Sequence, residues 1–162
     1  MDFNTIQKEV VQKFYGNRLR VRACGLVVKD DTLLLLKHNL GNGEVWLPPG
    51  GGIDVGESAY DCVRRELLEE ANLVVKSCDF LFAFEFINKP IHAIELFFRV
   101  TEMTGSFKLG SDAENSAPKV LVDGRFLSWK DISQMSKESL HGIFSYIENP
   151  IEILNLRGYF SH

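Results

Sequence analysis

The sequence predicts one domain, residues 1–162, of mixed α/β (α+β) class. Its length is close to the roughly 150 residues of an average domain. Apolar residues make up 45% and charged residues 25%, as in soluble globular proteins. Strand-forming segments follow one another with turns between them, and helical segments interrupt them. These observations exclude a disordered or fibrous chain and favour hairpins with helices packed against them.

The N-terminal part predicts one helix and three strands. Apolar residues at helical spacing over 5–15 indicate a short amphipathic helix. Residues 20–29 change from alternating to apolar, and 32–38 is rich in leucine, so we expect two strands. The two aspartates at 30–31 would join them as a hairpin. A short strand is expected at 46–47, after a glycine-containing loop.

The middle of the chain gives the strongest helix signal, over 58–71. Ser58 is a good N-cap, with an aspartate three residues later, and the apolar residues that follow lie on one stripe. Residues 73–88 are rich in strand formers, and a turn at Pro90 leads to a partner strand over 91–103. Phenylalanines recur at every second position of the first strand, which predicts four rings on one face. They are Phe80, Phe82, Phe84 and Phe86.

The C-terminal part is less regular. Residues 104–119 are polar and contain two glycines and a proline, and such long loops are often functional. A last strand is expected over 125–129, with helices over 130–135 and 138–148. We assign no structure to the tail at 151–162. Its apolar residues could form a homodimer interface or fold back on the core.

Charge and cysteine content narrow the partners and the compartment. The net charge of −4 gives no broad basic surface, so we expect no nucleic-acid partner. Three cysteines, with no Cys-x-x-Cys pair, are typical of reduced thiols in a cytoplasmic protein. We read Cys24 and Cys62 as small packing residues. No apolar run is long enough to cross a bilayer, and the first residues do not form a signal peptide.

Three glutamates lie close together on the helix predicted at 58–71. Glu66, Glu69 and Glu70 fall on one arc of this helix, beside its apolar stripe. Like charges at this spacing cost about 0.2–0.5 kcal/mol per exposed pair. A hard divalent cation, Mg²⁺ or Mn²⁺, would offset this repulsion because it prefers oxygen ligands. The alternative is a solvated acidic face, which is common on helix surfaces.

A glycine-rich loop directly before the helix favours the cation. The pattern Gly-x5-Glu-x7-Arg-Glu-Leu-x-Glu-Glu-x-x-Leu over 51–73 resembles the Nudix box of the Nudix hydrolases. The matching residues are Gly51, Glu57, Arg65, Glu66, Leu67, Glu69, Glu70 and Leu73. The family's glycine near the end is Asn72 here. Since asparagine tolerates a left-handed helix cap best after glycine, the change leaves the expected site intact.

The resemblance implies a fold, a reaction and roles for these residues. The fold is an α/β/α sandwich around a mixed sheet, and the reaction is hydrolysis of a nucleoside diphosphate linked to another group. The substrate would be a nucleotide sugar, ADP-ribose or a modified nucleoside triphosphate. Glu66 and Glu70 would be the main ligands of Mg²⁺ or Mn²⁺, often joined by the carbonyl of Gly51. Glu69 would be a third ligand or would hold the metal-bound water. Glu57 and Arg65 would form a supporting pair near the catalytic centre.

The general base and the substrate contacts stay open. Candidates for the base are Glu69, Glu85, Glu95, Asp112 and Glu114. If the hairpin turns at 89–91, Glu85 and Glu95 could sit opposite one another. Candidates for substrate binding are the basic residues Lys37 and His38 and the ring of Trp46. We read the histidines at 92, 141 and 162 as ordinary residues.

Two other functions use the same fold. A nucleotide-sensing module would bind its ligand without cleaving it, but such modules usually lose carboxylates of the box, and this chain has them all. A diphosphate isomerase would need a dedicated cysteine–glutamate pair, and we assign none.

Overall fold

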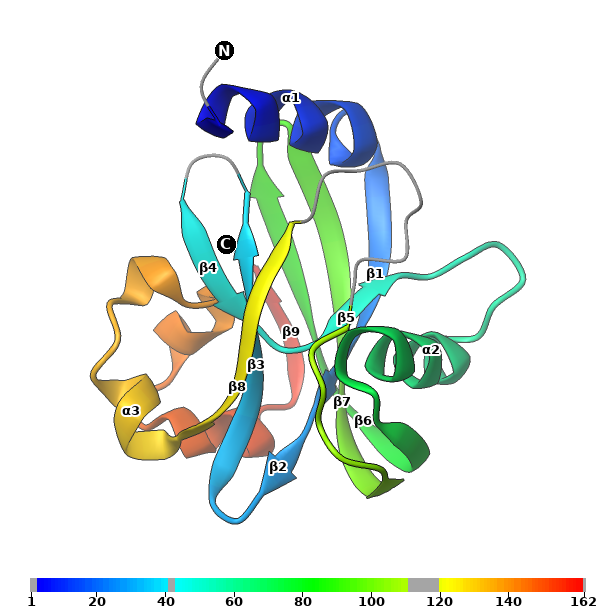
Figure 1. Ribbon diagram of the computed structural model, residues 1–162, viewed down its shortest axis with the longest axis vertical. Coiled ribbons are helices and arrows are strands. Elements are labelled where there is room, and N and C mark those ends of the chain that lie inside the picture. The colour runs from blue at the N-terminus through cyan, green and yellow to red at the C-terminus, as the bar shows by residue number, and fades with distance from the viewer. Residues whose placement is uncertain (1–2, 41–42, 111–119, 162) are drawn as a thin grey trace.

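A computed structural model describes residues 3–40, 43–110 and 120–161 of the chain (Figure 1). The α-helices are α1 (Phe3–Tyr15), α2 (Ala59–Ala71) and α3 (Trp129–Ser133). Three 3₁₀ turns follow, η1 (Lys137–Ser139), η2 (Gly142–Tyr146) and η3 (Pro150–Asn155). The strands are β1 (Leu19–Leu26), β2 (Val28–Lys29), β3 (Thr32–Asn39), β4 (Glu44–Leu47), β5 (Gly50–Gly52), β6 (Val74–Asn88), β7 (Ile91–Thr104), β8 (Leu121–Ser128) and β9 (Gly158–Ser161).

The strands form two sheets. A five-stranded mixed sheet has the order β5-β1-β7-β6-β9, with β1 parallel to β7 and β9 parallel to β6. A four-stranded antiparallel sheet contains β2, β3 and β4, with β8 paired to the other edge of β3. The mixed α/β class and the mixed sheet predicted from the sequence are confirmed.

The predicted hairpin of 20–29 with 32–38 is wrong for most of its length. Only Val28 and Lys29 pair with β3, whereas β1 pairs with β5 and β7 in the other sheet. The backbone N–H of Leu34 still donates to the carbonyl of Val27 at 3.0 Å, so the chain passes between the sheets at this residue. An apolar run predicts burial on both sides but does not show where a strand changes sheet.

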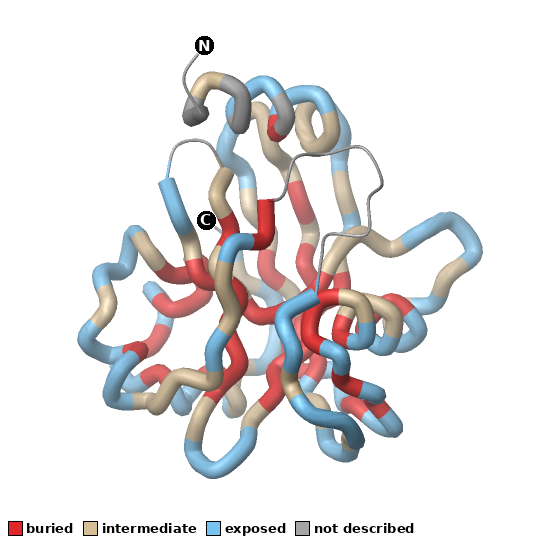
Figure 2. The backbone as a smooth tube through the Cα atoms, viewed as in Figure 1, coloured by how far each residue is buried: buried red, intermediate tan, exposed pale blue. Residues whose placement is uncertain are grey.

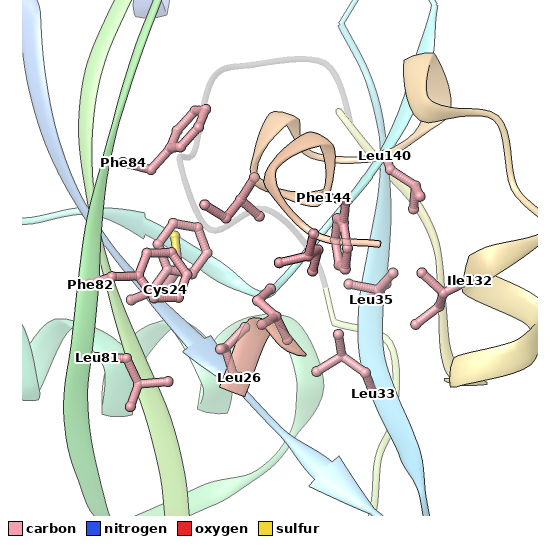
Figure 3. Close-up of a cluster of buried hydrophobic side chains, with 14 of the residues drawn as sticks. Cys24, Leu26, Leu33, Leu35, Leu81, Phe82, Phe84, Ile132, Leu140 and Phe144 are labelled. Carbon is pink, nitrogen blue, oxygen red and sulfur yellow. The ribbon is translucent and has the colours of Figure 1, made fainter. Parts of the chain in front are cut away.

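Two apolar clusters hold the layers together. Figure 2 shows the buried stretches of the backbone in red. In one cluster, apolar side chains of α2 pack against Leu34 and Leu36 of β3. Leu33 and Leu35 point the other way, toward Phe82 and Phe84 of β6, and meet α3 and the 3₁₀ turns (Figure 3). Alternate residues of β3 therefore serve opposite layers, which is the α/β/α arrangement.

Three register shifts interrupt the β6–β7 pairing. One of them inserts Leu81, which is buried, between Phe80 and Phe82. A bulge of this kind reverses which face the following residues occupy. Phe80 therefore packs on the ring of Phe98, while Phe82 stacks on Phe97 in the other cluster. The prediction of four phenylalanines on one face is wrong for Phe80.

The C-terminal segment differs from the predicted α-helix at 138–148. Residues there form η1 and η2, and Leu140 between them has extended backbone. The described part of the tail, residues 151–161, packs on its own chain. Ile153 of η3 is fully buried, and β9 adds an edge strand to β6.

The helix that carries the glutamates begins and ends where the sequence predicts. Ser58 accepts a hydrogen bond from the backbone N–H of Asp61 at 3.1 Å. Asn72 ends the helix in the left-handed conformation, with φ 58°. Its backbone N–H donates to the carbonyls of Leu67 and Leu68, about one turn before the helix ends, so asparagine does here what glycine commonly does.

Candidate active site

A cavity of about 750 Å³ lies between the two sheets. Its walls come from the glycine strand β5, the inner part of α2, β1 and the β6–β7 hairpin, and from β3, β4 and residues 137–145. Tyr15, the last residue of α1, also lines it. The volume lies within the roughly 300–1,000 Å³ of typical small-molecule sites.

The three helix glutamates differ in their surroundings. Glu70 is buried, and one of its oxygens, Oε2, accepts a hydrogen bond from the backbone N–H of Gly50 at 3.0 Å. Its other oxygen, Oε1, lies 3.9 Å from Nε2 of His38. Glu66 and Glu69 line the cavity and are partly exposed. Helix α2 thus presents the carboxylates of Glu66 and Glu69 to the cavity, while Glu70 is not among the described residues that line it.

Arg65 organises the acids around it. Its Nε and Nη2 donate to the two oxygens of Glu57 at 2.7 and 2.9 Å, and Nη1 contacts Glu66 at 2.6 Å and Glu69 at 3.4 Å. Nη2 also donates to the carbonyl of Gly52 at 3.0 Å. The hydrogen bond from Arg65 lowers the pKa of Glu57 to about 2. Arg65 therefore holds the loop before α2 against the helix.

Glu66 has the opposite shift. Burial raises the pKa of its carboxyl to about 7, with a further contribution from the charge of Glu70, although Arg65 acts in the other direction. A mostly buried carboxylate with an acidic neighbour is a favourable position for a cation, because positive charge would stabilise its ionised form.

The donor chemistry of this site suits a hard divalent cation. Carboxylate and carbonyl oxygens are the ligands that Mg²⁺ and Mn²⁺ prefer. A Cβ atom on Gly51 would overlap the carboxylate of Glu66 and would displace it from its present position. Within the described ranges, however, no three His, Cys, Asp or Glu side chains are gathered as a ready metal centre. Arg65 occupies part of the space between Glu66 and Glu69.

A second charged group, which we call the Arg22–Glu95–His141 network, forms another part of the cavity wall. Glu95 of β7 is 3% exposed, and both of its oxygens are engaged, Oε1 by Arg22 and Oε2 by His141 Nε2 at 2.5 Å. Burial would raise the pKa of Glu95, but His141 and Arg22 outweigh it and lower the pKa to about 2. Sequence reasoning did not find this network, because it read His141 as ordinary.

The candidates for the general base are not equally placed. Glu69 lines the cavity beside the other helix acids. The expected opposition of Glu85 and Glu95 is wrong, because Glu95 pairs with Phe84 and Glu85 with Ile94. The two acids therefore face opposite sides of the sheet, and Glu85 bonds His92 and Tyr159 instead. Asp112 and Glu114 lie outside the described residues.

The expected substrate contacts also need correction. His38 lines the cavity, but Lys37 and Trp46 are not among the described residues that do. Since neighbouring residues of a strand point to opposite faces, Lys37 turns away and pairs with Glu44 at 2.8 Å. Trp46 belongs to a buried apolar cluster.

The arginines of β1 were missed from the sequence. Arg20 and Arg22 both line the cavity, and the Arg20 guanidinium lies over the ring of Tyr15 at 4.5 Å. Their spacing of two residues in a strand, which puts both on one face, was the available signal. They give the cavity positive charge opposite the helix acids.

The site thus consists of a glycine strand that faces a glutamate-bearing helix beside a cavity of small-molecule size. The family model described as NUDIX domain matches residues 18–143, so the chain belongs to the Nudix family. Like the family's enzymes, it is a pyrophosphohydrolase.

Three similar proteins agree with this assignment. An ADP-ribose pyrophosphatase of Methanocaldococcus jannaschii is 29% identical over 123 residues, 66% of this chain and 72% of that protein. The Nudix hydrolase YvcI of Bacillus subtilis is 29% identical over 153 residues, 85% of this chain and 92% of that protein. The crystal structure of a MutT protein from Methanosarcina mazei has the same fold, with TM-score 0.67, 20% identity, and 86% and 96% of the two chains covered.

Among the described residues, no helix is long and apolar enough to span a membrane. The three cysteines are free and buried.

Proposed function

We propose that this enzyme hydrolyses the diphosphate linkage of a nucleoside diphosphate derivative, with Mg²⁺ or Mn²⁺ held by Glu66 and Glu70. The observation that carries the proposal is the packing of the glycine strand on the helix acids: Gly51 lies against the carboxylate of Glu66, and the N–H of Gly50 binds Glu70, beside a nucleotide-sized cavity. Glu69 and the Gly51 carbonyl complete the proposed donor set. A cation bound there would stabilise negative charge on phosphate oxygens as the linkage breaks.

The chain's own residues would divide the remaining work. Glu69 is the described acid that we propose to take a proton from the attacking water, because it lines the cavity and, at 33% side-chain exposure, is open to solvent. Glu57 and Arg65 hold the helix and its loop in register. His38 and Arg20 supply cationic or hydrogen-bonding groups for the phosphates.

The substrate belongs to one of three groups, a nucleotide sugar, ADP-ribose or a modified nucleoside triphosphate. The name of the Methanocaldococcus jannaschii relative, an ADP-ribose pyrophosphatase, supports ADP-ribose. We expect the enzyme to act in the cytoplasm, since free buried cysteines are typical of a reducing compartment. A homodimer stays a prediction, with the tail used within its own chain.

The test is product release from a panel of these compounds, with Mg²⁺ and with chelator, on wild type and Glu70→Gln. Glutamine can still accept the Gly50 hydrogen bond, so the fold should survive. Loss of several kcal/mol of transition-state stabilisation predicts a fall in kcat of about 100-fold or more. Glu85→Gln is the control, because Glu85 lies on the other face of the sheet. Full activity in Glu70→Gln would refute the metal assignment. Tight binding with no product would favour a nucleotide sensor.

A further inference from the structure

The glycine strand β5 has no side chains to hold it in place. Its three residues pair with β1, with Gly50 opposite Cys24 and Gly52 opposite Arg22. A Cβ atom on Gly50 would overlap the β1 backbone, so this close approach requires glycine. Two guanidinium groups add to the backbone pairing. Arg65 donates to the carbonyl of Gly52, and Arg22 donates to the carbonyl of Gly50 at 3.0 Å.

Arg22 connects this strand to the far wall of the cavity. Its Nη1 pairs with Glu95 while its Nη2 binds Gly50, so one planar group bridges a buried carboxylate and the glycine strand. The N–H of the same Gly50 donates to Glu70 at 3.0 Å. A continuous series of hydrogen bonds thus runs from Glu95 through Arg22 and Gly50 to Glu70.

His141 anchors the other end of the series. Its backbone N–H donates to the carbonyl of Trp46 in β4 at 3.0 Å, while its side chain binds Glu95 in β7. One residue therefore links the two sheets that form the cavity. Its Nδ1 accepts the N–H of Ile143 at 3.1 Å, which leaves Nε2 as the nitrogen that donates to Glu95.

We propose that Arg22 and Glu95 are positioning residues that, anchored by His141, hold the glycine strand and the Glu70 carboxylate in the geometry needed to bind a divalent cation. The proposal rests on the proposed function, in which Glu70 is a ligand. We assign Glu95 this positioning role because Arg22 and His141 each hold one of its oxygens. Fixing Glu70 Oε2 on Gly50 leaves its Oε1 for the cation.

Two conservative substitutions separate this role from simple packing. In Glu95→Gln the new amide has one acceptor oxygen for two facing donors, so either Arg22 or His141 loses its partner. In Arg22→Lys the charge beside Glu95 is kept, but a single Nζ cannot replace a fork that binds Glu95 and Gly50 together. Both substitutions loosen Gly50 without touching Glu70.

The chain offers a matched control for each substitution. Glu85 is also a glutamate of the β6–β7 hairpin bonded by a histidine and a second donor, His92 and Tyr159, but it does not line the cavity. Arg64 of α2 also bridges a carboxylate and a carbonyl, Asp61 and Lys76, on the outer surface. Glu85→Gln and Arg64→Lys therefore repeat the chemistry away from the site.

The experiment is calorimetric binding of Mn²⁺ alone to the full chain, in wild type and these four variants, with kcat measured across Mn²⁺ concentrations. We expect the Kd for Mn²⁺ to rise by about 10- to 100-fold in Glu95→Gln and Arg22→Lys and to stay unchanged in the controls. Excess Mn²⁺ should restore much of the lost kcat, which would not follow from a general packing defect. Circular dichroism checks folding, and Arg22→Lys decides the matter if Glu95→Gln does not fold.

The proposal would be overturned if Glu95→Gln and Arg22→Lys both fold and bind Mn²⁺ with the same Kd as an active wild type. A loss of affinity that the two controls share would also overturn it. A wild type that neither binds Mn²⁺ nor cleaves any substrate would instead refute the proposed function on which the role of this network rests.

Discussion

Glu66→Gln should make the metal-free protein more stable near neutral pH. The folded chain holds the pKa of Glu66 at about 7, against 4.5 for an ordinary glutamate. The folded state therefore binds this proton more tightly than the unfolded state. Protonation of Glu66 therefore favours folding at a pH below 4.5, the pKa in the unfolded chain, and this contribution is lost as the pH rises through about 7. At about 1.4 kcal/mol per pKa unit, the loss approaches about 3 kcal/mol at high pH.

Urea denaturation in chelator measures this effect directly. The quantity to follow is the free energy of unfolding of wild type minus that of Glu66→Gln, from about pH 5 to about pH 8. We expect this difference to fall by about 2–3 kcal/mol across the range, because the substituted glutamine cannot ionise while it can still accept a hydrogen bond from Arg65. A constant difference would show that burial does not penalise the Glu66 carboxylate, and the reasoning would be wrong.

The same reasoning predicts how an added metal ion changes the free energy of unfolding. A cation that binds the ionised site should stabilise wild type at high pH by the linkage between binding and folding. We therefore expect added Mg²⁺ to remove most of the fall in wild type and to change Glu66→Gln much less. Equal stabilisation of both proteins would place the bound cation away from Glu66.

Two further predictions concern other parts of the site. Glu57→Gln should lower the free energy of unfolding by about 1.5–3 kcal/mol at neutral pH, because it removes a charge-assisted pair with Arg65. Because the pKa of Glu57 is about 2, the stabilisation from its pair with Arg65 is complete above pH 4.5 and disappears as the pH falls toward 2. The denaturation curves of wild type and Glu57→Gln should therefore converge in acid. Gly110→Ala should destabilise the fold by about 1–3 kcal/mol, because a Cβ there overlaps the carbonyl of Glu69. It should also weaken Mn²⁺ binding, and a variant that matches wild type in Tm and Kd would contradict this contact.

Local signals explain which elements were predicted well. The bounds of α2 follow from a serine cap, an apolar stripe and an asparagine that adopts φ 58°, and all three are properties of a short stretch of sequence. Helix α1 likewise ends before Asn17, which has a left-handed conformation. The Nudix box is such a stretch, so the sequence alone predicted where its residues lie relative to the helix.

The errors came from pairing between distant segments. The passage of the chain between sheets at Val27 leaves no mark in an apolar run. The insertion of Leu81 reversed the face of Phe80, and a shift of one position separated Glu85 from Glu95. Because side chains alternate along a strand, one residue of register decides whether a charge enters the cavity or leaves it. For the same reason, Lys37 and His38 are neighbours in β3 but point to opposite faces.

The site's carboxylates fall into two groups by their partners. Glu57 and Glu95 each accept from arginine, and in both the pKa falls to about 2. They are fully ionised and already neutralised by neighbouring groups, so they gain little from a cation. Glu66 lies beside Glu70, and its pKa rises to about 7 even with Arg65 in contact. Only a further positive charge would make its ionised form favourable at neutral pH. Glu57 and Glu95, which are paired with arginines, therefore hold the site in shape. Glu66, whose charge is not fully neutralised, lies where a metal would act.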